Sequence, residues 1–152
     1  MTYIPSKFVR ACLAFTILLL SIGAGQTAFA EINSYKARSG NNRFSVEVIP
    51  AGKTELNRLY SWQAKIIPSA SSVLASADYV LKPGDIKISG GMPAHGHGLP
   101  TRPRVTHVSR TSNGEFLLTI EGLKFQMWGD WVLVIALPGI SDKAEASFNL
   151  AP

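Results

Sequence analysis

Length, composition and charge exclude several classes of protein. The chain has 152 residues, of which 46% are hydrophobic and 16% are charged, with a formal net charge of +5 and one cysteine. The length fits one domain plus at most a processed segment, and the hydrophobic fraction excludes a disordered tail protein. A single cysteine excludes a disulfide scaffold and a thiolate zinc module, because each needs several sulfur atoms.

The first thirty residues have the three-part layout of a secretory signal peptide. Lys7 and Arg10 precede an apolar run at residues 12–22, and Ala28 and Ala30 offer the small side chains of a cleavage site. The run is shorter than the roughly 20 residues that span a membrane. We expect residues 1–30 to be removed, with no transmembrane anchor left; a retained anchor is the alternative.

Cleavage would change the charge and the sulfur content. Removal of Lys7, Arg10 and Cys12 lowers the net charge of +5 by two and leaves no cysteine. The predicted localisation is periplasmic or secreted. An exported protein has little access to DNA or RNA, so we expect no nucleic-acid partner.

Alternating apolar and polar residues indicate strands along the rest of the chain. The clearest cases are residues 43–48, 60–66, 115–121 and 143–150. Residues 131–137 are apolar on both faces, as in a central strand. Shorter candidates are residues 86–89 and 104–110, and residues 73–80 fit either a strand or a helical turn.

Turn residues separate the strand candidates and favour one fold class. Asn113-Gly114 between two candidates indicates a hairpin turn. Seven or eight short strands without a long helix predict an all-β, antiparallel, immunoglobulin-like β-sandwich over residues 43–152. Trp62 is a candidate core aromatic, and the polar residues 31–42 are expected to be a flexible lead.

One stretch, residues 90–103, breaks the strand pattern. It is too rich in Gly and Pro for the interior of a strand or helix, and its Met and His residues distinguish it from a flexible linker. We therefore expect a shaped loop. The residues expected to shape it are Gly90, Gly91, Pro93, Gly96, Gly98 and Pro100.

Two histidines are the chemical centre of this loop. His95 and His97 are at positions i and i+2, which project to the same side of an extended segment, so both imidazoles can bind one metal ion. Met92 precedes them, and Met127 lies in a later turn that a sandwich can bring to the same end. Imidazole and thioether are soft, neutral ligands that suit copper, especially Cu(I).

The distribution of charge favours a soft ion over a hard one. Residues 86–114 contain no Asp or Glu but carry Lys87, Arg102, Arg104 and Arg110. Calcium and hydrolytic zinc sites usually need a carboxylate. Two alternatives stay open: the loop holds an anion or an acidic partner, or it is a rigid cap whose imidazoles bind backbone groups.

Two sequence blocks together form a recognisable pattern. Residues 90–98 read Gly-Gly-Met-Pro-Ala-His-Gly-His-Gly, and in residues 121–131 an aromatic residue, a Met, a turn and a Trp lead into a strand. These blocks resemble the YtkA-like/FixH-like family of exported bacterial domains. The resemblance implies a small extracytoplasmic β-sandwich. Some members are membrane-anchored and associated with copper handling or cytochrome oxidase assembly.

The resemblance also implies a ligand set. Carried over by position, the candidate metal ligands are Met92, His95, His97 and Met127. At position 99 the family often has Met where this chain has Leu, and Met127 is followed by Trp where the family often has Pro. The loss of one thioether would weaken a copper site.

The leading prediction is an exported copper-binding protein, with a copper ion as its cofactor. The alternative is a structural or interaction module that serves a membrane-bound or periplasmic protein partner. We do not expect an enzyme, because the mature chain lacks a cysteine nucleophile and a Gly-x-Ser-x-Gly elbow. A carboxylate such as Asp130, brought to the histidines by the fold, would reopen that possibility.

Overall fold

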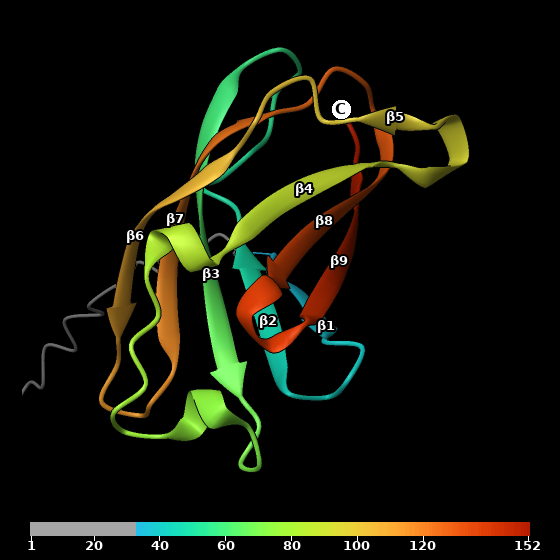
Figure 1. Cartoon of the computed structure of the whole chain (residues 1–152). Helices are drawn as coiled ribbons and strands as arrows, with labels where there is room; N and C mark the ends of the chain where they lie inside the picture. The colour runs from blue at the N-terminus through green and yellow to red at the C-terminus, as the bar shows by residue number, and fades with distance from the viewer. Residues whose placement is uncertain (1–32) are drawn as a thin grey trace, which may run out of the picture. The chain divides into compact units, whose positions relative to one another are not determined.

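Two antiparallel sheets form the part of the protein that the computed structural model describes, residues 33–152 (Figure 1). One sheet has the strand order β1-β2-β3-β7-β6 and the other has the order β5-β4-β8-β9. The nine strands in these residues are β1 (Tyr35–Arg38), β2 (Phe44–Ile49), β3 (Leu59–Pro68), β4 (Lys87–Met92), β5 (His97–Gly98), β6 (Arg104–Arg110), β7 (Phe116–Lys124), β8 (Gly129–Leu137) and β9 (Asp142–Leu150).

Short 3-10 helices lie in the connections between strands. They are η1 (Val73–Ala75), η2 (Pro83–Asp85), η3 (Pro93–His95) and η4 (Pro138–Ile140). In residues 33–152 no helix is long and apolar enough to cross a membrane. The predicted signal peptide, residues 1–30, lies outside the described residues.

Alternate burial along the strands produces the core between the two sheets. In β9, every second residue from Asp142 to Leu150 is buried and the residues between them are exposed, as the period-2 pattern predicts. Trp62 is fully buried, as expected, and its ring lies 5.1 Å from Phe125 and 5.6 Å from Phe148, centroid to centroid. The all-β, two-sheet prediction is therefore confirmed for these residues.

The structure differs from the prediction in the stretch before β2. The stretch expected to be a flexible lead contains β1, which pairs with β2 and stacks Tyr35 on Phe148 with a centroid distance of 4.9 Å. Alternation over only four residues is too short to be recognised in the sequence. Of the two alternatives for residues 73–80, a strand or a helical turn, the structure has the second: they begin with η1 and contain no strand.

The antiparallel order sorts the connections to two ends of the sandwich. Residues 50–58, 93–103 and 125–128 lie at one end, which we call the hairpin end. They contact one another or the adjoining strands. The Asn57 N–H donates to the carbonyl oxygen of Phe125 at 2.7 Å, and the Thr101 hydroxyl donates to that of Gly122 at 2.6 Å.

Candidate functional site

Most of the stretch expected to be a loop, residues 90–103, belongs to a β-hairpin. The hairpin consists of β4, η3 and β5 and lies at the hairpin end of the sandwich (Figure 1). Gly90 and Gly91, predicted to shape a loop, lie instead in the interior of β4. The absence of a side chain is what allows this: a Cβ at Gly90 would lie 2.5 Å from the carbonyl oxygen of Val132, and one at Gly91 would collide with that of His97. Glycine here permits close strand packing.

The other shaping residues occupy the turn of the hairpin and the segment after it. Pro93 begins η3, Gly96 ends it in the left-handed region with φ of 66°, and Gly98 lies in β5. A left-handed conformation favours glycine because it has no Cβ. Pro100 follows β5 in the connection to β6.

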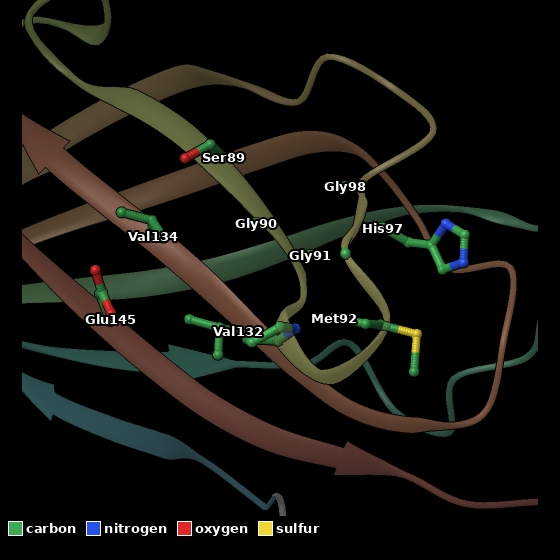
Figure 2. Close-up of a pocket in the computed structure, with 11 residues that line it drawn as sticks. Ser89, Gly90, Gly91, Met92, His97, Gly98, Val132, Val134 and Glu145 are labelled. Atoms are coloured by element: carbon green, nitrogen blue, oxygen red, sulfur yellow. The ribbon is translucent and has the colours of Figure 1, made fainter.

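The hairpin register places Met92 directly opposite His97. Cross-strand partners in an antiparallel pair project to the same face with their Cβ atoms about 5 Å apart. Figure 2 shows both side chains extending to the same side of the hairpin. The thioether and the imidazole are therefore neighbours through the register, although five positions separate them in sequence.

The two imidazole rings lie close together at the exposed tip of the hairpin. The ring centroids of His95 and His97 are 6.4 Å apart and the ring planes are inclined by 18°. A metal–nitrogen bond is about 2 Å long, so two rings on one ion have centroids up to about 6 Å apart. Both side chains are exposed.

Met92 and Met127 differ sharply in exposure. Met92 is 1% exposed, and its methyl carbon lies 3.0 Å from the position of a Cβ at Gly129. Met127 is 38% exposed in the turn before β8, and the Trp131 indole N–H holds that turn by donating to the Met127 carbonyl oxygen at 3.1 Å. The fold thus brings the second sequence block against Met92 at Gly129.

A groove of about 400 Å³, which no pattern in the sequence predicts, lies beside the hairpin (Figure 2). Its lining includes Gly91, Val132, Val134 and Glu145. Met92 and His97 line the same groove, and Figure 2 shows Val134 and Glu145 at its other end. The alternation of β9 was visible in the sequence, but that β8 lies between β4 and β9 depends on the strand order.

The carboxylates near the hairpin already have partners. Glu145 pairs with Lys143 at 2.7 Å, and Asp130, the candidate acid, accepts a hydrogen bond from Asn149 at 2.7 Å.

In residues 33–152 no three His, Cys, Asp or Glu side chains are arranged to hold a metal ion. The remaining histidine, His107, lies in β6 opposite Thr119. The donors gathered at the hairpin are two imidazoles and one thioether.

Comparison with known proteins gives no match. No family model, no curated protein and no solved structure matches the chain.

Proposed function

We propose that this chain is an exported, immunoglobulin-like β-sandwich protein of the periplasm that binds copper at the β4–β5 hairpin. His95, His97 and Met92 would hold the ion, with Met127 as a further ligand. The protein would carry copper and pass it to a protein acceptor by ligand exchange, with no catalytic role of its own.

The observation that carries the proposal is the register of the hairpin. Met92 faces His97 across the strand pair, and the ring of His95 lies 6.4 Å from that of His97. One buried thioether and two exposed imidazoles thus come from six residues of chain, Met92 to His97. Soft sulfur and imidazole nitrogen together favour copper over calcium or magnesium, which prefer oxygen ligands.

The arrangement also suits release of the ion. The imidazoles are exposed, so an acceptor can approach them directly, while Met92 is buried. Two exposed imidazoles and one buried sulfur would allow the ligands to be replaced one at a time.

A second candidate function rests on the packing of Met92. Its burial, together with the glycine contacts of β4, also suits a rigid cap that presents the hairpin to a protein partner without metal. The two functions differ in what happens when the imidazoles are removed: only the first makes ion affinity depend on them.

A copper titration of the purified protein against a competing Cu(I) chelator separates these functions. We expect His95→Ala/His97→Ala to lower Cu(I) affinity at least about tenfold, which corresponds to about 1.4 kcal/mol of binding free energy. His107→Ala is the matched control and should bind as the wild type does. Since the replaced side chains are exposed, the double variant should melt at nearly the wild-type temperature.

The role of sulfur is tested by Met92→Leu. Leu has a similar volume, so the core should tolerate it at a cost below about 1.5 kcal/mol. We expect Cu(I) affinity to fall while Cu(II) affinity changes little, because the thioether prefers the softer ion.

Equal Cu(I) affinity in the wild type and the double His variant would overturn the copper proposal. Loss of partner binding in the double His variant without any metal dependence would favour the rigid cap.

A further inference from the structure

The outer face of the four-stranded sheet has an apolar central strand. β8 lies between β4 and β9 (Figure 1). Every second residue of β8 is buried in the core, and the half-buried residues between them, on the outer face, are Val132, Val134 and Ala136. In the middle of the other sheet, β3 carries polar residues on its outer face, namely Ser61, Gln63 and Lys65. A solvated sheet face is usually polar, so the face of β8 suits contact with another surface.

The strand register arranges the side chains of this outer face in rows that cross the sheet. One row consists of Lys87, Ala136 and Lys143, and the next consists of Ser89, Val134 and Glu145. Cross-strand partners have Cβ atoms about 5 Å apart, and two rows on one face are about 7 Å apart along the strands. Lys143 and Glu145, neighbours on the outer face of β9, form an ion pair at 2.7 Å.

We propose that this face binds a second copy of the chain, sheet against sheet, around a two-fold axis that crosses the strands between the two rows. This axis places Lys143 of each copy opposite Glu145 of the other, and Ala136 opposite Val134. Each of these four charges then has an opposite charge both within its own chain and across the axis. A two-fold interface uses the same patch on both copies, so the patch must complement itself.

Charge favours this axis over the other two-fold arrangements of the same face. An axis along β8 would exchange β4 with β9 and place Lys87 opposite Lys143. An axis that crosses the strands at the level of either row would place Lys143 opposite Lys143, or Glu145 opposite Glu145. Like charges that face each other across an interface are unfavourable. Only the axis between the rows pairs opposite charges.

The size of the face indicates how strong the dimer is. β4, β8 and β9 have 6, 9 and 9 residues, so together they span roughly 15 Å by 30 Å. A stable interface buries about 800 Å² on each partner, and smaller ones are usually transient. We therefore expect a reversible, concentration-dependent dimer. It does not rest on the copper proposal, because neither Lys143 nor Glu145 is a candidate ligand.

Analytical ultracentrifugation of the purified protein tests the dimer, and two charge reversals test the axis. We expect a monomer–dimer mixture whose dimer fraction rises with concentration. Lys143→Glu and Glu145→Lys should each raise the dimer dissociation constant at least about tenfold, because the facing charges become alike. An equal mixture of the two variants should form a heterodimer about as readily as the wild type dimerises, because every facing pair is then opposite.

The matched control uses the ion pair between Arg58 and Glu55. Its side chains are 67% and 56% exposed, against 62% and 52% for Lys143 and Glu145. Arg58→Glu changes the net charge as Lys143→Glu does and should leave the dissociation constant unchanged. A wild type that stays monomeric at every concentration would overturn the proposal. So would a dimer that neither reversal of the β9 pair weakens, or that mixing the two variants does not restore.

Discussion

Gly91 shows how one residue type can determine the shape of the hairpin. A methyl group there would meet the carbonyl oxygen of His97, and it would lie 3.1 Å from the Cα of Gly98. Both neighbours are backbone atoms of β5, so a side-chain rotation cannot relieve the collision. Position 91, which pairs with Gly98 of β5, therefore needs glycine so that the two strands can approach each other closely.

Gly91→Ala tests this role. We expect the free energy of unfolding in urea to fall by about 1–3 kcal/mol, the usual cost of overpacking. Gly139→Ala is the matched control, because a Cβ at Gly139 meets nothing within 4 Å. Unfolding of both variants at the same urea concentration would contradict the close approach of the β5 backbone to Gly91.

At the scale of elements, Asp142 connects the first residues of β9 to the turn between β1 and β2. Its Oδ1 accepts the N–H of Asn41 at 3.1 Å and that of Lys143 at 2.9 Å. Burial raises the pKa of this carboxyl, but the neighbouring Ser39 hydroxyl and these N–H groups outweigh it and hold the pKa below its ordinary value of 3.8. The charged form therefore stabilises the fold.

The pH dependence of stability follows from this lowered pKa. The contribution of Asp142 is complete above its unfolded value of 3.8 and is lost as the pH falls through the lower folded value. We expect Asp142→Asn to lose about 1–2 kcal/mol at pH 7 and to show a weaker fall in melting temperature below pH 4. Glu145→Gln, which breaks an exposed ion pair, should change stability by less than about 1 kcal/mol.

Glu47 supplies a second, separate part of the acid dependence. A hydrogen bond from Ser34 and the charges of Lys36 and Lys65 outweigh its burial and keep its pKa below 4.5. Both the wild type and Asp142→Asn retain this contribution. An unchanged acid profile in Asp142→Asn would mean that the carboxylate of residue 142 is not stabilised by the fold.

For the whole molecule, the processing of the N-terminus is the main prediction. The first strand begins at Tyr35, so cleavage after Ala30 would leave every described strand intact. We expect the intact mass of the protein recovered from the periplasm of an expressing bacterium to correspond to a chain that begins at Glu31. Ala30→Phe, which puts a large side chain at the cleavage site, should accumulate as the uncleaved chain. A full-length mass in the wild type would contradict the prediction.

Most strands could be predicted because burial leaves a local trace in the sequence. A half-buried strand alternates every second residue, and the patterns that predicted β2, β3, β7 and β9 needed no knowledge of their partners. The Asn113-Gly114 turn between β6 and β7 could be predicted for a different local reason, the residue types that turns require. Gly114 has φ of 81°, a conformation that L side chains rarely adopt.

The candidate site could be predicted only as a set of residue types. The sequence by itself determined that soft donors occur together without carboxylates, and that strands surround them. Only the tertiary structure decided that Met92 faces His97 and that β1 joins the first sheet. The physical reason is that alternation reports burial at each residue, whereas register and strand order depend on contacts between residues far apart in the chain.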